Sequence, residues 1–335
     1  MNTKLFLLIG VVACTSPTEP IPKSPITSST PTTVTPPTPT LPAALDTSTF
    51  AIPDTVLLSA LIRMGLPITN GRMLTREALG VTQLTIGRGP GYRPPEGGLW
   101  TGTNGHYISD LTGLEKFTNL RTLRIEHQKI TSIPLHAFPN LQLVSLWGNP
   151  ITALDVSRNT SLVTLGLSET GLTEIDVSNL SALFEVNFQN DADRPLPYTL
   201  PNGTIVRGFS KLDFSKNPGL TRIYIWNNGL TSENLILSND AKNVLTDFWA
   251  YKNKFTHLSF LDYKELSTIV LYDNQLETLD LRRVGQAVSY YVPSGLYTTG
   301  NPRLLQIRVT NPGMTIHQRS LGAPIYIDPW TQFIP

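Results

Sequence analysis

The hexapeptide Leu120-Arg121-Thr122-Leu123-Arg124-Ile125 decides the fold, because its pattern returns in phase along the chain. The next copy, Leu141-Gln142-Leu143-Val144-Ser145-Leu146, begins 21 residues later. Further copies begin at Leu162 and Leu183 with the same spacing, and looser copies begin at Leu220, Leu245, Leu266 and Leu304. A short motif that repeats at a fixed period predicts one structural unit stacked on copies of itself.

A polar residue follows each of the first seven copies at a nearly constant offset. These polar residues are Gln128, Asn149, Thr170, Asp191, Asn228, Asn253 and Asn274. We expect the aliphatic residues of each copy to form a short strand with its apolar side chains pointing into a coil. The polar residue would then satisfy backbone groups where the chain turns away from the strand, which an apolar side chain could not do.

The complete pattern resembles the L-x-x-L-x-L-x-x-N-x-L motif of leucine-rich repeats, over about residues 81–316. The second half of a repeat, such as Leu154-Asp155-Val156-Ser157-Arg158-Asn159, favours turns and short extended segments over helix. This form of the repeat resembles that of leucine-rich-repeat lipoproteins of the Bacteroidota and, more distantly, that of internalins. The resemblance implies an α/β repeat solenoid that is predominantly β, right-handed and curved, with a small N-terminal helical cap, built to bind a partner.

Residues 46–80 have the pattern of that cap, and residues 317–335 would close the other end. Helical spacing predicts a helix over Pro53–Met64, and a second short helix begins at Thr75, which could cap it. In the family, the segment between two such helices often looks like a calcium loop. Here the loop, Ile68–Leu74, lacks the acidic side chains that calcium requires, so we expect no metal there.

The start of the chain has the pattern of a secretory signal, with Lys4 followed by the short apolar run Leu5–Val12. The run ends in Val11-Val12-Ala13-Cys14, which resembles the bacterial lipobox. The resemblance implies a signal peptide over residues 1–13 and lipidation of Cys14, the only cysteine. The absence of Asp after Cys14 implies an outer-membrane lipoprotein of the cell envelope. Residues 14–45 are rich in Pro, Thr and Ser, which predicts a disordered linker.

The phase of the repeat also identifies the side chains that point outward from each strand, on the face expected to be concave. In the later copies these are large and aromatic. The candidate ligand-binding residues are Trp147, Arg222, Tyr224, Trp226, Trp249, Tyr251 and Tyr272. Exposed aromatic patches often mark interaction sites, and Trp, Tyr and Arg are enriched in binding hot spots. The alternative is that neighbouring rings only pack on each other and stiffen the sheet.

Three insertions interrupt the period, at residues 87–107, 192–208 and 285–300. Their aromatic residues are Tyr92, Trp100, Tyr198, Tyr290, Tyr291 and Tyr297. The first two insertions follow directly on a strand, so we expect them to leave the solenoid at the same edge. They could form a rim around the binding face, or they could lie against the coil.

The composition argues against several other functions. A net charge of +1 over 335 residues does not provide the clustered positive surface that nucleic acid requires. The five histidines are scattered, and no catalytic, cofactor or metal motif occurs, so we expect no enzyme and no cofactor. We therefore predict a monomeric adhesion-type module that captures a protein or a glycan. The alternative is a structural component of an envelope complex.

Overall fold

The computed structural model describes residues 47–87, 107–240, 244–261, 263–284, 295–310, 312 and 325–335. Several sequence predictions lie outside these residues. They are the signal peptide, Cys14, the linker over 14–45, the greater parts of the first and third insertions, Tyr92, Trp100, Tyr290 and Tyr291.

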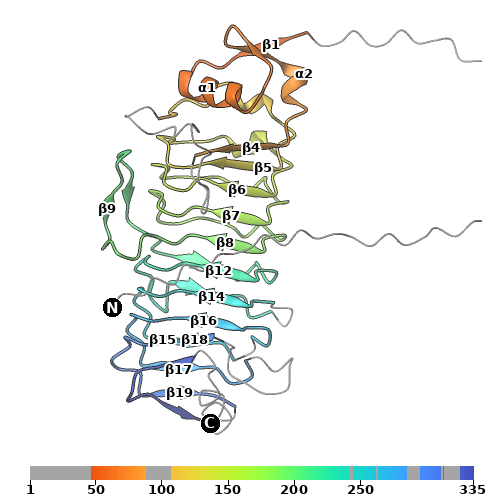
Figure 1. The fold of residues 1–335 in the computed structure, drawn as a ribbon. Helices are drawn as coiled ribbons and strands as arrows, with labels where there is room; N and C mark the ends of the chain where they lie inside the picture. Colours follow the sequence, from red (N-terminus) through yellow and green to blue (C-terminus); the bar gives the residue numbers. More distant parts are fainter. Residues whose placement is uncertain are drawn as a thin grey trace, which may run out of the picture. The chain divides into compact units, whose positions relative to one another are not determined.

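Ten parallel strands, one from each coil, form the main sheet. In spatial order they are β4 (Gln83–Ile86), β5 (Thr122–Ile125), β6 (Leu143–Ser145), β7 (Thr164–Gly166), β8 (Glu185–Asn187), β12 (Arg222–Tyr224), β14 (Asp247–Trp249), β16 (Thr268–Val270), β18 (Gly295–Tyr297) and β20 (Ile325–Tyr326). Figure 1 shows them stacked one above the other. The pairs keep a constant register, as in Leu123↔Val144 and Val144↔Leu165. The structure thus confirms the predicted leucine-rich-repeat solenoid, which is predominantly β.

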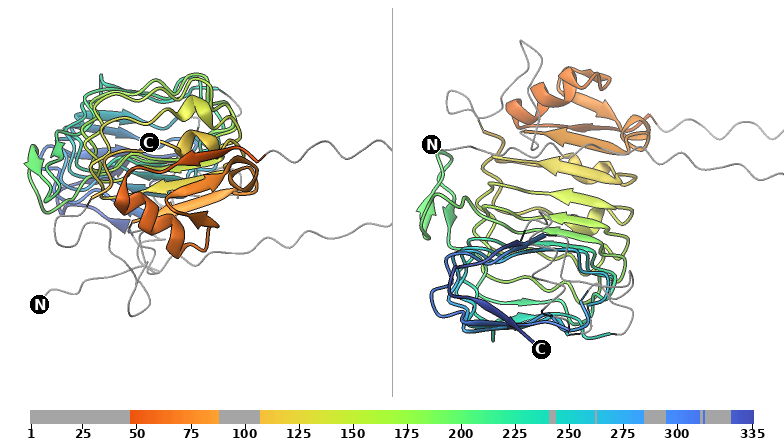
Figure 2. Two further views of the ribbon diagram at one scale, coloured as in Figure 1. Left: turned by 90° about the horizontal axis from the view of Figure 1, so that it is seen from above. Right: turned by 60° about the horizontal axis from the view of Figure 1, so that its bottom comes forward.

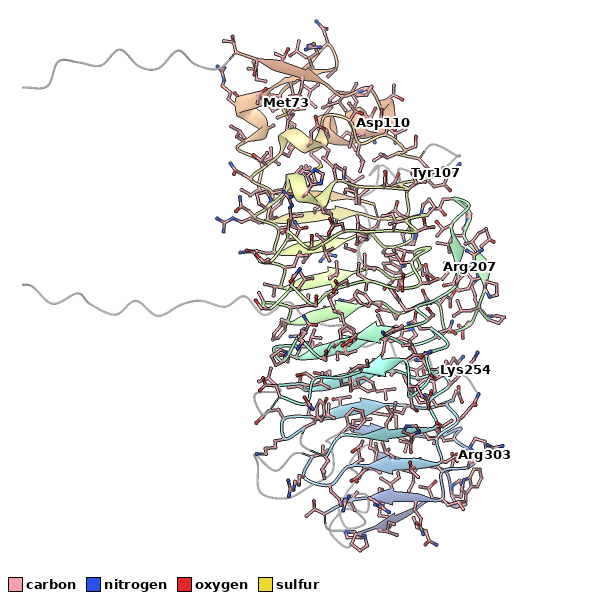
Figure 3. All side chains as sticks on the ribbon, turned by 180° about the vertical axis from the view of Figure 1, so that it is seen from behind. Met73, Tyr107, Asp110, Arg207, Lys254 and Arg303 are labelled. Atoms are coloured by element: carbon pink, nitrogen blue, oxygen red, sulfur yellow. The ribbon has the colours of Figure 1, made fainter. Side chains whose placement is uncertain are left out.

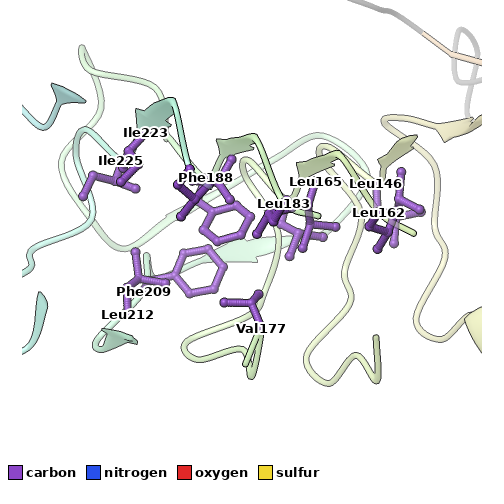
Figure 4. Close-up of a cluster of buried hydrophobic side chains, with 14 of the residues drawn as sticks. Leu146, Leu162, Leu165, Val177, Leu183, Phe188, Phe209, Leu212, Ile223 and Ile225 are labelled. Carbon is purple, nitrogen blue, oxygen red and sulfur yellow. The ribbon is translucent and has the colours of Figure 1, made fainter. Parts of the chain in front are cut away.

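The aliphatic positions of the repeat fill the inside of every coil. Leu123, Val144, Leu165 and Val186 are each fully buried, one above the other. Figure 4 shows part of this core, where the ring of Phe188 lies among the aliphatic side chains of neighbouring coils. One continuous cluster extends from Phe50 to Ile327. A single coil could not bury these side chains, so each repeat depends on its neighbours.

The opposite side of the solenoid changes along its length. Early coils carry short 3-10 helices, η2 (Leu114–Lys116) and η3 (Leu135–Ala137). Next comes the strand pair β11 (Leu212–Asp213) and β13 (Leu235–Ile236). The last coils form a parallel four-stranded sheet of β15 (His257–Ser259), β17 (Thr278–Asp280), β19 (Gln306–Arg308) and β21 (Gln332–Ile334). Within the described strands, β13 and β15 do not pair. Figure 2 shows both sides of the coils. The predicted short extended segments are therefore present, and they join into small sheets.

A ladder of buried asparagines connects successive coils where the chain leaves the main sheet. The Oδ1 atom of Asn253 accepts hydrogen bonds from the backbone N–H groups of Asn228, at 3.1 Å, and Leu230, at 3.0 Å. Its Nδ2 atom donates to the carbonyls of Ile225 and Ala250. The amide thus satisfies backbone groups of two adjacent coils, as the sequence pattern predicts.

The prediction of Asp191 as a ladder residue is wrong by one position. Asp191 is exposed, and the preceding residue Asn190 is buried instead. Asn190 accepts from the backbone N–H of Glu169 at 3.0 Å and donates to the side chain of Asn228 at 2.9 Å. An amide both donates and accepts in this position, whereas a carboxylate only accepts and would be costly to bury.

The predicted third insertion, 285–300, contains a strand of the main sheet. Gly295–Tyr297 forms β18 and pairs with β16. Asn301 continues the ladder by accepting from the backbone N–H of Leu276 at 2.9 Å. Leu304 therefore does not open a copy of the motif, because it leads into β19 of the second sheet. The insertion shifted the apparent phase, and the looser spacing concealed the strand.

The N-terminal elements of the described chain share the core of the first coils. They are β1 (Thr49–Ala51), α1 (Thr55–Arg63), β2 (Ile68–Thr69), β3 (Arg72–Leu74) and α2 (Thr75–Ala78). Helix α1 begins two residues later than predicted, because the Asp54 carboxylate caps it by accepting from Val56 and Leu57. Thr75 is the first residue of α2, and its side chain does not cap the helix.

The predicted loop over Ile68–Leu74 is instead an antiparallel hairpin, in which β2 pairs with β3. Its turn residues Asn70 and Gly71 have positive φ angles of 52° and 70°. Two successive residues with positive φ form the tight turn that joins antiparallel strands, so this segment closes as a hairpin. Among the described residues, no cluster of three or more His, Cys, Asp or Glu side chains could hold a metal ion.

The second insertion forms the hairpin of β9 (Tyr198–Thr199) and β10 (Ile205–Val206). Figure 1 shows it beside the stack, and Figure 3 places its Arg207 on the same side as Lys254 and Arg303. This side carries the turns that follow the strands, as expected for an insertion directly after β8. None of the described helices has the length and apolar character needed to cross a membrane.

Candidate binding surface

Five of the predicted aromatic residues lie together on the outer face of the main sheet. We call Tyr224, Trp226, Trp249, Tyr251 and Tyr272 the ring row. Tyr224 pairs in register with Trp249, while Trp226, Tyr251 and Tyr272 follow two residues after β12, β14 and β16. All five side chains are partly exposed. The repeat phase therefore oriented them correctly, because none lies inside the coil.

The rings of the row pack closely on one another. Tyr251 stacks on Trp226, with ring centroids 5.0 Å apart and planes inclined by 11°, and on Tyr272 at 4.2 Å and 17°. Tyr224 meets Trp249 edge to face, at 5.8 Å and 82°. Within the row, neighbouring rings therefore pack on each other, as the alternative interpretation of the sequence predicted. Of the three stacked rings, the central one, Tyr251, has a neighbour on both of its faces.

The polar atoms of the row lie in a partly desolvated environment. Burial raises the pKa of Tyr224 to about 12, with a further contribution from the charges of Asp247 and Glu185. Burial raises the pKa of Tyr251 and of Tyr272, and the interaction between their two hydroxyls further affects both pKa values. The indole Nε1 of Trp249 is buried without a hydrogen-bond partner among the described residues. The hydroxyls thus remain neutral at physiological pH.

Two further tyrosines lie on the same face, on strands that the sequence analysis did not assign to it. Tyr297 of β18 stacks on Tyr326 of β20 with centroids 5.0 Å apart, and Tyr326 is 55% exposed. Val270 lies between Trp249 and Tyr297 in register but is buried. The spacing from Leu296 to Asn301 is the same as that from Ile269 to Asn274, and it could have revealed the extra strand.

Trp147 stands apart from the ring row, although the sequence analysis grouped them. It follows β6, which is separated from β12 by β7 and β8. Its indole Nε1 donates to the Glu169 carboxylate at 3.0 Å, and its ring packs against His127 at 4.9 Å. The indole nitrogen of Trp147 is therefore already paired, and its role in ligand binding stays a prediction.

Arg222 borders the ring row but is already paired. Its Nη1 lies 2.8 Å from Oε2 of Glu185, and its guanidinium lies over the ring of Phe184 at 5.1 Å. The other carboxylate oxygen of Glu185 accepts from Asn187 at 2.7 Å. The pair therefore contributes no net charge to the surface.

The hairpin of the second insertion lies against the coil. Of the two arrangements considered for the insertions, a rim or a segment against the coil, it adopts the second. The Tyr198 hydroxyl donates to Glu169 at 2.8 Å. Asn202 Nδ2 donates to the carbonyls of Gln128 and Gly148. The hairpin thus reaches back over coils that precede it by more than 50 residues.

The base of the hairpin lies beside the ring row. Asn227, which follows Trp226, donates to the carbonyls of Asp191 and Arg194. The ammonium of Lys252, which follows Tyr251, donates to the carbonyl of Ala192 at 2.7 Å. These contacts hold residues 191–194 at the edge of the row.

Glu126, the residue after β5, is only 1% exposed. Its Oε1 accepts from Ser145 at 2.6 Å, and Arg124 lies 3.5 Å away. Its Oε2 has no hydrogen-bond partner among the described residues. Burial raises the pKa of this carboxyl, against the opposing effect of Ser145 and Arg124.

Comparisons with known proteins give weak structural likenesses. No known family profile matches the sequence, and no curated protein is significantly similar to it. The functional domain of InlJ from Listeria monocytogenes, which includes a cysteine ladder, is 17% identical, covers 84% of this chain and 70% of that chain, and has a TM-score of 0.41. An internalin C2 from the same species is 15% identical, with coverages of 84% and 94% and a TM-score of 0.42. A leucine-rich-repeat protein of Leptospira interrogans is 17% identical, with coverages of 64% and 62% and a TM-score of 0.32.

Proposed function

We propose that this chain is a lipid-anchored binding protein of the cell envelope that captures a protein partner on the ring row. The partly exposed rings supply a contiguous aromatic surface on a rigid parallel sheet. A rigid surface loses little conformational entropy on binding, and large exposed aromatic patches usually mark interaction sites.

The mutual stacking of the rings favours a protein over a glycan. Sugars pack their C–H groups against the electron-rich faces of aromatic rings. Both faces of Tyr251 are covered, by Trp226 on one side and Tyr272 on the other. The central ring of the stack therefore offers no free face to a sugar, whereas an aromatic row with polar atoms suits the mixed apolar and polar contacts of a protein surface. This stacking is the observation that carries the choice.

A binding screen with a paired variant tests the proposed function. The full chain with Cys14→Ser is applied to arrays of purified extracellular and cell-surface proteins, printed beside a glycan array. For a protein hit, we expect Trp226→Ala plus Trp249→Ala to weaken binding by about 30-fold, the effect of losing one hot spot. Trp330→Ala, which removes an exposed indole outside the row, should bind as the unmodified protein does.

Three results would overturn this proposal. One is a protein hit whose affinity survives the double substitution while circular dichroism shows an intact fold. Another is binding confined to the glycan array. The third is the absence of any binding together with recovery of a stoichiometric membrane partner, which would favour a structural component of an envelope complex.

The anchor is tested separately through Cys14. In the source bacterium we expect the protein to partition into the detergent phase of a Triton X-114 extraction, and Cys14→Ser to move it to the aqueous phase. Protease treatment of intact cells then decides which face of the outer membrane carries the domain. Aqueous partition of the unmodified protein would exclude the lipid.

A further inference from the structure

Carboxylates gather where the hairpin base meets the ring row. Asp191 and Asp193 lie in the base and are exposed, and the backbone N–H of Asp193 donates to the carboxylate of Asp191 at 3.0 Å. Asp273 directly follows Tyr272 and is also exposed. The carboxylates therefore come from two separate parts of the chain, because the hairpin was inserted after β8 and folded back.

The electrostatic effect of these carboxylates reaches the rings. After burial and the interaction with Tyr272, the charges of Asp193 and Asp191 contribute to the raised pKa of Tyr251. Asp273 and Asp193 do the same for Tyr272. Asp193 thus acts on both hydroxyls of the stacked pair, and the contacts of Asn227 and Lys252 hold the hairpin base that carries it at the edge of the row.

The balance of charge around the row is negative. Glu185 and Arg222 neutralise each other, and Arg194 lies over the ring of Tyr198 at 4.2 Å. Among the described residues near the row, Asp191, Asp193, Asp247 and Asp273 then oppose Arg194 and Lys252. The chain as a whole carries a net charge of +1, so this surface has the opposite sign to the average of the molecule.

We propose that the ring row and the hairpin base form one composite surface that recognises lysine and arginine side chains of its protein partner. This inference rests on the proposed function and adds the chemistry of the partner. The aliphatic stems of such side chains would lie along the partly exposed rings, and their charged ends would meet the carboxylates. Charge complementarity of this kind sets partner choice and association rate.

A titration with short peptides tests the composite surface without knowledge of the natural partner. The probes are two unlabelled dodecapeptides of Gly and Ser, one with four arginines and the other with four glutamates. The intrinsic fluorescence of the full chain with Cys14→Ser reports binding, because Trp226 and Trp249 lie within the row. We expect the arginine peptide alone to change the emission, and the change to weaken as NaCl rises from about 20 to 200 mM.

Matched charge variants test which carboxylates are responsible for binding of the arginine peptide. Asp193→Asn plus Asp273→Asn should weaken binding of the arginine peptide by about tenfold and reduce the salt dependence of that binding. Glu174→Gln plus Glu265→Gln removes two other exposed carboxylates and should leave binding unchanged. Equal binding of the glutamate peptide, or equal losses in the two double variants, would overturn the inference. A protein hit that requires Trp226 and Trp249 but ignores Asp193, Asp273 and salt would keep the proposed function and reject only its charge chemistry.

Discussion

At the scale of single residues, the buried carboxyl of Glu126 links stability to pH. Its raised pKa means that the folded protein holds a proton at this site more tightly than the unfolded chain does. Below the unfolded pKa the carboxyl is neutral in both states and costs nothing. As pH rises above that value and through the folded pKa, the buried charge forms and stability is lost.

Substitution with glutamine removes this pH dependence while keeping the shape of the side chain. We expect Glu126→Gln to raise the free energy of unfolding at pH 7 relative to the unmodified protein, and the difference to shrink as pH falls toward about 4. Urea denaturation at a series of pH values measures the difference in unfolding free energy at pH 7 and its change with pH. A constant difference between the two proteins across this range would show that Glu126 is not the titrating group.

The ladder residue Asn253 contributes stability through five hydrogen bonds between its side chain and the backbone. Replacing it by alanine leaves the amides of Asn228 and Leu230 without their acceptor inside the coil. We expect Asn253→Ala to cost about 3 kcal/mol of unfolding free energy, because buried groups without partners are expensive. The exposed Asn179, changed to alanine, should cost less than about 0.5 kcal/mol. If urea denaturation gave similar losses of unfolding free energy for the two variants, the ladder role of Asn253 would be contradicted.

At the scale of elements, a buried hydroxyl is among the contacts that hold the hairpin of β9 and β10 against the coils. Tyr198 donates to Glu169 and accepts from the backbone N–H of Asp191 at 3.0 Å. We expect Tyr198→Phe to loosen the hairpin by about 1 kcal/mol, so that the amide of Leu200 exchanges hydrogen about fivefold faster. Tyr326→Phe, which alters an exposed hydroxyl, is the control. Unchanged exchange at Leu200 would mean that the hydroxyl contacts do not fix the hairpin.

At the scale of the whole molecule, each coil is stabilised mainly by its neighbours. Leu296 is fully buried in β18 near the C-terminal end of the stack. Leu296→Ala should cost about 3 kcal/mol and raise hydrogen exchange in β16, β18 and β20, while β5 to β7 stay protected. Leu165→Ala, in β7, should show the reverse distribution. Equal acceleration throughout the sheet in either variant would indicate one cooperative unit.

The sequence predicted what depends on local periodicity. Aliphatic residues at fixed spacing determined the main sheet, and the same phase oriented Trp226 and Tyr251 outward. Contacts that join distant segments could not be predicted. The return of Asn202 onto the coils of Gln128 and Gly148 depends on the path of an insertion, which no repeat encodes. Insertions also shifted the apparent phase, which concealed β18 and its Tyr297.

The break between β13 and β15 has a mechanical consequence. On that side the two coils are joined by side chains, such as Ser232, which accepts from the backbone of His257 at 3.0 Å. On the opposite side the same two coils are joined by the continuous pairing of β12 with β14. A load that bends the solenoid between these two coils would therefore open this seam, with β12 and β14 as the fold line. The rings of Tyr224, Trp226, Trp249 and Tyr251 lie along that line, so bending would compress them together.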